Sequence, residues 1–213
     1  MKKIITIGTV ITTLAGLPAF GQGYFQFMAG KSQVWDCLDW TPSFSTEINT
    51  AFLWAPDGSI PAVSSIMLSS PTNGLSMFSI STVWTAILTD PNFVLGVNND
   101  NGQTAIGRTF FNGAIGYNSG YAFPVAGTSP GDSYTVFMIG WDGAYATPEL
   151  AQAATAGVGW SAAFSYTATA QTSIPNSFMG RTPGFGVWGV PEPSTLALAG
   201  LGGFALWLFR RRK

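Results

Sequence analysis

The sequence predicts a mainly β protein whose body is an antiparallel β-sandwich or jelly roll with one short helix. Three observations support this fold class. Short apolar or alternating runs follow one another along the body, and Gly, Pro, Asn or Asp interrupts each of them. Only one segment carries the start and stop signals of a helix. The chain holds 26 Gly and 13 Pro but only 9% charged residues, which suits strands joined by tight turns.

The first predicted strands are Tyr24–Met28 and Ile48–Trp54. In the second of these, Ile48, Phe52 and Trp54 share one face because side chains alternate along a strand. Further strands are predicted at Ala62–Leu68, Phe93–Val97, Thr104–Phe111 and Phe185–Trp188. Turns are predicted at Ala55–Gly58, Ser70–Gly74 and Asn98–Gly102, where Pro, Asn, Asp and Gly gather.

The centre of the body is expected at Tyr134–Trp141. This is the most apolar segment of the body, and it predicts a central strand buried on both faces. From Phe164 to Ala170, apolar residues alternate with Ser and Thr, which predicts a strand exposed on one face. Met77–Leu88 is interpreted as two strands, or as one strand with a bend near Ser81 and Thr82.

The one helix is predicted at Pro148–Ala156. Thr147 is suited to cap its first turn, and Pro148 is tolerated there because its missing N–H has no partner within a helix. Glu149 complements the positive end of the helix dipole, and Gly157 ends the helix.

The amino terminus predicts a signal peptide at residues 1–21. Lys2 and Lys3 precede the apolar run Ile4–Leu17, and the small residues Ala19 and Gly21 then mark a signal peptidase site. Cleavage after Gly21 leaves residues 22–189 as a single body domain of ordinary size.

The carboxyl terminus, residues 190–213, has three adjacent parts. Prolines keep the first part extended; it consists of Val190, Pro191, Glu192, Pro193 and Ser194. The apolar run Thr195–Phe209 predicts a membrane helix about 22 Å long, which is shorter than the bilayer core of about 30 Å. Four positive charges follow as a stop-transfer signal: Arg210, Arg211, Arg212 and Lys213.

This terminus closely resembles the PEP-CTERM sorting signal of exported bacterial proteins. The resemblance rests on a Val-Pro-Glu-Pro-Ser motif, a short helix rich in Leu, Gly and Ala, and an arginine-rich tail, all in order. It implies that exosortase, a membrane protease, recognises Pro191–Pro193 and cleaves nearby.

A weaker resemblance covers residues 135–169, where Trp141-Asp142, a short helix and the turn Gly157–Ser161 are similar to a segment of other PEP-CTERM proteins. It implies a shared sandwich domain of unassigned activity.

Charge is distributed unevenly along the chain. Six of the nine Lys and Arg residues lie in the terminal segments, so the body keeps only Lys31, Arg108 and Arg181. Nine of the ten acidic residues lie in the body, and three positive against nine negative charges give it a formal charge of −6. An acidic body without a basic patch argues against a nucleic acid partner.

The single cysteine, Cys37, excludes an intrachain disulfide. It is interpreted as a buried small hydrophobe, with an intermolecular bridge as the alternative.

The chemistry available to the body is limited because the chain has no His. Ser-His-Asp triads and His-ligated zinc are therefore excluded, and no catalytic residue, metal site or cofactor is predicted. The best carboxylate pair is Asp36 and Asp39, with Trp35 and Trp40 beside them, although an acidic loop with core tryptophans is the preferred interpretation. Asn98–Gly102 has oxygen ligands at alternating positions, but a hairpin turn explains it better than a calcium loop.

These observations predict an exported protein held in the membrane by its carboxyl-terminal helix and then moved to the cell surface or an exopolysaccharide matrix. The expected role of the body is structural or adhesive, without enzymatic activity. The first alternative is a carbohydrate-binding module that uses exposed aromatic residues, since the body holds seven of the eight tryptophans. The second is a glycoside hydrolase built on two carboxylates. The expected partners are signal peptidase, exosortase, the membrane and an extracellular polysaccharide.

Overall fold

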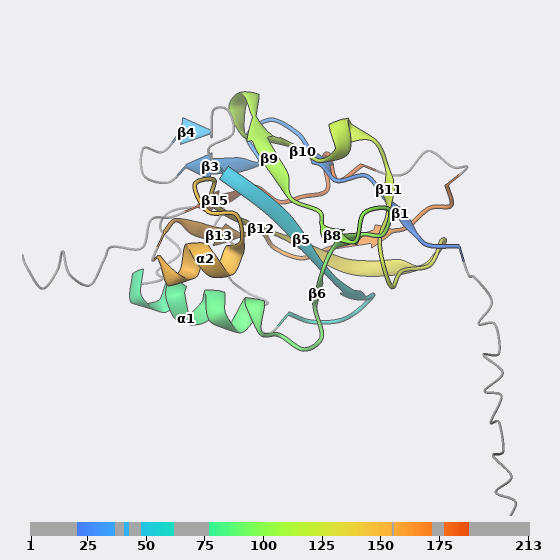
Figure 1. Cartoon of the computed structure of the whole chain (residues 1–213), viewed down its shortest axis with the longest axis horizontal. Helices are drawn as coiled ribbons and strands as arrows, with labels where there is room; N and C mark the ends of the chain where they lie inside the picture. The colour runs from blue at the N-terminus through green and yellow to red at the C-terminus, as the bar shows by residue number, and fades with distance from the viewer. Residues whose placement is uncertain are drawn as a thin grey trace, which may run out of the picture.

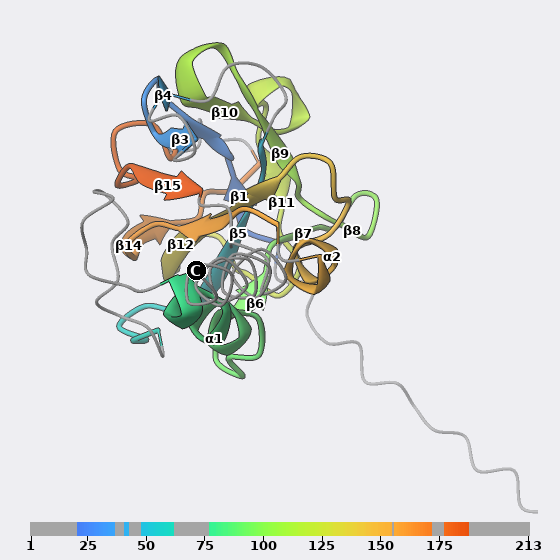
Figure 2. The same cartoon turned by 90° about the vertical axis from the view of Figure 1, so that its left-hand side faces the viewer.

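The computed structural model describes residues 21–36, 41–42, 48–61, 77–154, 156–171 and 177–187. These residues form a mainly β body with mostly antiparallel, curled sheets and two α-helices (Figures 1 and 2). The strands of the first half are β1 (Tyr24–Phe25), β2 (Met28–Ala29), β3 (Val34–Asp36), β4 (Thr41–Pro42), β5 (Ile48–Pro56), β6 (Val94–Leu95), β7 (Val97–Asn98) and β8 (Gln103–Thr104). Those of the second half are β9 (Gly107–Phe110), β10 (Ala114–Gly116), β11 (Phe123–Pro124), β12 (Ser133–Asp142), β13 (Val158–Trp160), β14 (Phe164–Thr167) and β15 (Phe185–Val187). The helices are α1 (Met77–Leu88) and α2 (Pro148–Ala153), with single 3-10 turns η1 (Phe111–Gly113) and η2 (Asn118–Gly120).

The largest sheet has the strand order β13-β12-β5-β9-β10-β2, and every pair in it is antiparallel. Strands β14 and β6 also belong to this sheet and pair with β12 and β5. Strands β5 and β12 form its centre, and their pairing is continuous from Tyr134 opposite Pro56 to Asp142 opposite Ile48. Both strands were predicted from the sequence and are confirmed, with β12 buried on both faces.

Smaller pairings surround this sheet. Strand β1 pairs with β11, β7 forms a hairpin with β8, and β3 pairs with β4, all antiparallel. Strand β15 pairs with β3 in parallel, so the last described segment lies beside one of the first. The pair β7–β8 confirms the predicted hairpin at Asn98–Gly102, and Gly102 has the positive φ of 68° that this turn requires.

The two faces of the central sheet are buried against different partners. We call them the aromatic face and the helical face. The aromatic face carries Phe52 and Trp54 of β5 with Tyr134, Val136 and Met138 of β12. The helical face carries Ala51 and Leu53 of β5 with Phe137, Ile139 and Trp141 of β12. This division follows directly from the alternation of side chains along a strand, as predicted for Ile48, Phe52 and Trp54.

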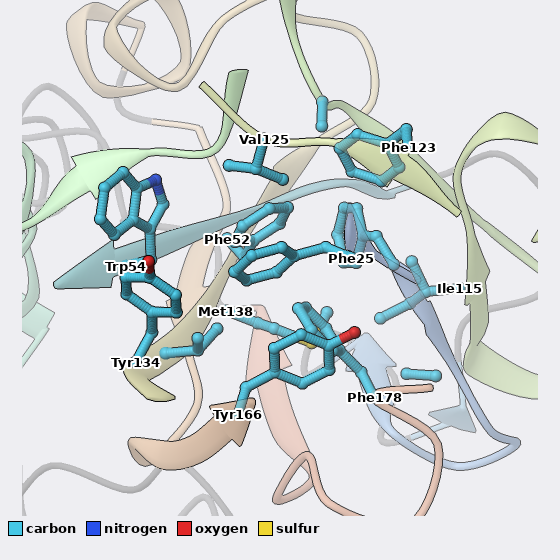
Figure 3. Packing of buried hydrophobic residues seen from close by; sticks show 14 of the residues in the cluster. Phe25, Phe52, Trp54, Ile115, Phe123, Val125, Tyr134, Met138, Tyr166 and Phe178 are labelled. Carbon is cyan, nitrogen blue, oxygen red and sulfur yellow. The ribbon is translucent and has the colours of Figure 1, made fainter. Parts of the chain in front are cut away.

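The aromatic face is covered by rings from the beginning and the end of the body (Figure 3). Phe25 of β1 stacks on Tyr166 of β14 with ring centroids 4.6 Å apart. Phe178 makes edge contacts with Phe52 at 5.3 Å and with Tyr166 at 4.9 Å. Phe25, Phe52, Tyr166 and Phe178 are fully buried, so this cluster is the main hydrophobic core of the body.

The helical face is covered by α1 and α2, which lie on the same side of β5 and β12 (Figure 1). Trp84 of α1 is fully buried, and its ring lies 6.3 Å from that of Trp160 on β13. The indole nitrogen of Trp84 donates a hydrogen bond to the carbonyl oxygen of Pro148, at 3.4 Å, which joins the two helices.

The prediction of strands at Met77–Leu88 is therefore wrong, because this segment is helix α1. The expectation of a single short helix is wrong with it. Trp84 and Ile87 are three residues apart and both are buried, while Val83 and Leu88 are partly buried beside them. This is helical spacing. The packing of these residues against the sheet outweighs the strand preference of the β-branched residues nearby.

Helix α2 confirms the predicted start and corrects the predicted end. The Thr147 hydroxyl accepts a hydrogen bond from the backbone N–H of Leu150 at 3.3 Å, as an N-cap should. The helix ends at Ala153 rather than Ala156, because Ala154 already has the backbone geometry of a C-cap.

Three predicted strands are interrupted. Phe93–Val97 is divided between β6 and β7, which belong to different sheets. Tyr24–Met28 becomes β1 and β2 because its partners change, from β11 to an isolated bridge between Gln26 and Ser177 and then to β10. Thr104–Phe111 is divided between β8 and β9. The predicted strand at Ala62–Leu68 and the turn at Ser70–Gly74 lie outside the described residues.

Candidate functional site

Most of the site residues predicted from the sequence lie outside the described part of the chain. This applies to the sorting motif Val190–Ser194, the apolar run Thr195–Phe209, the basic tail Arg210–Lys213 and Ala19 of the signal peptidase site. Gly21, the other residue of that site, is described and is exposed to solvent. Among the helices that the structure describes, none is long and apolar enough to cross a membrane.

The structure does describe the strand that leads to the sorting motif. In β15, Phe185 and Val187 are buried, and the N–H of Phe185 donates to the carbonyl oxygen of Gln33 at 2.8 Å. Strand β15 also lies close against β13, because a Cβ on Gly159 would overlap the carbonyl oxygen of Gly186. Position 159 needs glycine for this close backbone approach. The folded core therefore continues to Val187, three positions before Val190.

The carboxylate pair suggested by the sequence is only partly described. Trp35 is 36% exposed, and its indole nitrogen donates to the carbonyl oxygen of Ser32 at 3.1 Å. Asp36 ends strand β3, whereas Cys37, Asp39 and Trp40 lie outside the described residues. The structure therefore describes one carboxylate of this pair, that of Asp36, and the pair stays a prediction.

The other tryptophans that the structure describes do not form an exposed platform. Of the five that the structure describes, four are at most 9% exposed: Trp54, Trp84, Trp141 and Trp160. The indole nitrogen of Trp141 donates to the carbonyl oxygen of Tyr145 at 2.8 Å, as is usual for a core tryptophan. These four residues belong to the core, which leaves Trp35 as the exposed tryptophan among the described residues.

In the asparagine-rich segment, the side-chain oxygens of Asn98 and Asn101 are engaged in the turn. The side-chain oxygen of Asn98 accepts from the N–H of Asp100 at 3.0 Å, and that of Asn101 accepts from the N–H of Gln103 at 2.9 Å. The amide nitrogen of Asn98 donates to the Tyr117 hydroxyl at 3.0 Å. Such bonds are typical of a structural turn. Within the described ranges, no group of three or more Cys, Asp or Glu side chains could hold a metal ion.

An open depression of about 550 Å³ lies where β5 ends and β12 begins. Its polar lining consists of Asp57, Asn92, Ser129, Asp132 and Ser133. Both aspartates are exposed, and one carboxylate oxygen of Asp57 accepts from the Ser165 hydroxyl at 3.1 Å. The nearly buried rings of Trp54 and Tyr134, which meet edge to face at 5.2 Å, lie in its wall.

Sequence reasoning missed this depression because its lining comes from four separate stretches of the chain. They lie at residues 54–57, 92–94, 127–129 and 132–134, and the pairing of β5 with β12 brings the first and last together. Asp57 and Asp132 each lie in or beside a Pro- and Gly-containing turn, and this was the one signal that the sequence offered.

Comparison with known proteins adds information on the carboxyl terminus. The family model of the PEP-CTERM protein-sorting motif matches residues 189–213. No curated protein matches the chain, and no solved structure matches it. The chain is thus a protein with a C-terminal PEP-CTERM sorting domain, which confirms the resemblance seen in the sequence. The motif implies export, membrane-associated sorting and processing by exosortase, a membrane protein.

Proposed function

We propose that the protein is a structural or adhesive component of the cell surface or of an exopolysaccharide matrix, sorted there by exosortase, with no catalysis of its own. One observation carries this proposal: a sorting motif at residues 189–213 follows directly on a body whose core strand β15 ends at Val187. Cleavage near Pro191–Pro193 removes no residue of the described core. The released body therefore keeps its fold.

The proposed route uses both ends of the chain. Signal peptidase removes residues 1–21, and Thr195–Phe209 holds the body in the membrane while Arg210–Lys213 stay on the cytoplasmic side. Three extended residues cover at most about 10 Å. The first residue of the motif, Val190, therefore lies within that distance of Val187, and the motif is presented close to the membrane where exosortase acts.

The architecture of the body suits a passive role. We assign it to the β-sandwich or jelly-roll class, in which an aromatic core between sheets supplies the stability that a chain with one cysteine cannot obtain from intrachain disulfides. A protein released outside the cell benefits from such a core because no chaperone is available to refold it.

The absence of catalysis is supported by the lack of His in the chain. Replacing Asp36 and Asp39 by Asn should leave any surface phenotype intact. A polysaccharide-degrading activity that disappeared in this double variant would contradict the proposal and favour the two-carboxylate hydrolase instead.

The proposed destination is tested by fractionation of a host that carries exosortase and of the same host without it. With exosortase, the body should be found at the cell surface or in the extracellular matrix, without residues 195–213. Without exosortase, the full carboxyl terminus should remain in the membrane fraction. Equal amounts of cleaved body in both hosts would contradict the proposal.

A further inference from the structure

The depression at the end of β5 has the mixed lining of a small-molecule site. Its volume of about 550 Å³ lies within the range of about 300–1,000 Å³ that ligand sites occupy. The side chain of Val94, which is 52% exposed, supplies apolar surface, and the nearly buried rings of Trp54 and Tyr134 form the wall behind it. Carboxylate, amide and hydroxyl groups are distributed around this surface, so one ligand could meet both kinds of contact.

The polar groups of the lining indicate the chemistry of the ligand. Asp57 and Asp132 offer carboxylate oxygens that accept hydrogen bonds, and Asn92 can both donate and accept. Among the described residues, neither Lys nor Arg lines the depression. An anionic ligand such as a phosphate or a uronic acid would be repelled by the two carboxylates. A molecule with several uncharged hydroxyl groups and apolar C–H surface fits both the acceptors and the apolar surface.

The walls of the depression are held in place by hydrogen bonds. The Tyr134 hydroxyl accepts from the backbone N–H of Ser129 at 2.7 Å, and the N–H of Asp57 donates to the carbonyl oxygen of Ser133 at 3.2 Å. The hydroxyls of Ser133 and Thr167 lie 2.8 Å apart. Because the wall is already ordered, a ligand loses little affinity to the ordering of protein groups.

The position of the depression relative to the sorting motif is also informative. The depression lies at Ser133, where β12 begins, whereas β15 contacts β12 near Gly140. Seven residues of strand separate these points by about 23 Å. Figure 1 shows β15 toward one end of the molecule and the tip of β5, which ends at Pro56, toward the other. A body tethered through β15 would therefore present the depression away from the membrane.

We infer that this depression is a binding site for an uncharged polysaccharide, taking one or two sugar rings of the polymer. The inference rests on the proposed function, because it names the ligand through which an adhesive body would be retained in a matrix. The aspartates accept hydrogen bonds from vicinal sugar hydroxyls, and the exposed side chain of Val94 packs against the C–H face of the ring. Binding is the role of the site rather than hydrolysis: a general acid needs an apolar, water-poor setting, and both aspartates are exposed.

The test uses the full chain in dodecylphosphocholine micelles, since a detergent with a sugar headgroup would compete for the site. Migration is measured in native gels that contain dextran, galactomannan or xyloglucan, and amide NMR shifts are followed for Gly127, Ser129 and Asp132. We expect at least one polymer to slow migration and to shift these amides. The double variant Asp57→Asn with Asp132→Asn should bind at least tenfold more weakly. Asp100→Asn, which removes one charge from the exposed β7–β8 turn, is the control and should bind normally.

Three results would overturn the inference. The first is migration unchanged by all three polymers, and the second is equal retardation of the double variant and the unmodified chain. The third is a shift of the same amides by calcium chloride alone, with no effect of any polymer, because it would assign the two carboxylates to a cation. None of these three binding results changes where the body is found in the exosortase host. The binding site can therefore fail its test while the proposed function passes its own, and the reverse also holds.

Discussion

The two faces of the central sheet differ in how they are stabilised. On the aromatic face, rings from β1, β5, β14 and the segment before β15 contact one another, so residues from both ends of the body share one core. On the helical face, two helices of twelve and six residues cover the same strands with side chains from the middle of the chain. The aromatic face depends on pairings between distant segments, and the helical face depends on more local ones. Damage to the aromatic face should therefore loosen the whole body, whereas damage at the edge of the helical face should stay local.

The largest effect is expected from Phe178→Ala on the aromatic face. Phe178 is fully buried and contacts the rings of Phe25, Phe52 and Tyr166, so truncation leaves a cavity at the centre of the cluster. We expect the free energy of unfolding to fall by about 3–5 kcal/mol, measured by urea denaturation. Phe111→Ala is the control, because Phe111 is 59% exposed with Lys31 over its ring; its loss should cost less than about 1 kcal/mol. Equal decreases in the free energy of unfolding for the two variants would contradict the assignment of Phe178 to the core and of Phe111 to the surface.

The next effect is a loss of stability at alkaline pH that also arises on the aromatic face. Burial raises the pKa of Tyr166 to about 12 from its usual 10.0, against smaller lowering effects of the Gln26 backbone hydrogen bond and of Arg181. Between these two values the unfolded chain releases the proton and the folded chain keeps it, so stability is intact below pH 10 and falls as pH rises to 12. The loss should reach about 2–3 kcal/mol. Tyr166→Phe removes the titrating hydroxyl. Urea denaturation at several pH values should then show a smaller fall in the free energy of unfolding between pH 10 and pH 12. An unchanged fall would show that Tyr166 does not cause the alkaline loss of stability.

The smallest effect is expected from Thr147→Ala at the edge of the helical face. The hydroxyl of Thr147 caps α2 by accepting from the N–H of Leu150. Its removal should lower the free energy of unfolding by about 1 kcal/mol, and hydrogen exchange should accelerate in α2 but not in β12. Thr147→Ser keeps the hydroxyl and should restore both values. Accelerated exchange throughout β5 and β12 would mean that the two faces are not independent.

The sequence predicted those parts of the fold that local patterns determine. Alternation placed Ile48, Phe52 and Trp54 on one face, and the apolar run at Tyr134–Trp141 marked the central strand. The cap at Thr147 identified α2 for the same reason, since capping depends on residues close in the chain.

Helix α1 and the depression could not be predicted in this way. In α1 the first turn has no acidic residue and the last turn no basic one, and β-branched residues suggested strands. The spacing of Val83, Trp84, Ile87 and Leu88 was its only helical signal, and the sheet that makes this spacing favourable comes from other parts of the chain. The depression was missed for the same reason, because Asp57 and Asp132 approach each other only after β5 pairs with β12.

The proposed sorting route depends most on the carboxyl-terminal motif, and we propose that its apolar run Thr195–Phe209 is a membrane segment handled by a partner. Ala199 and Gly203 offer small residues four apart, on which another helix can pack closely, and the glycines of the run lower its helix stability by about 1 kcal/mol each relative to alanine. Replacing Arg210–Lys213 by Ser should disturb anchoring and topology themselves. Replacing Glu192 should affect recognition alone.

The most direct test is therefore the maturation rate of Glu192→Ala in a host with exosortase, followed by pulse-chase labelling. Loss of this carboxylate leaves the prolines, the membrane run and the basic tail unchanged. We expect the variant to stay in the membrane fraction at full length while the unmodified chain is cleaved. Cleavage of the variant at the normal rate would contradict the sorting role of residues 189–213 and would leave them as a simple membrane anchor.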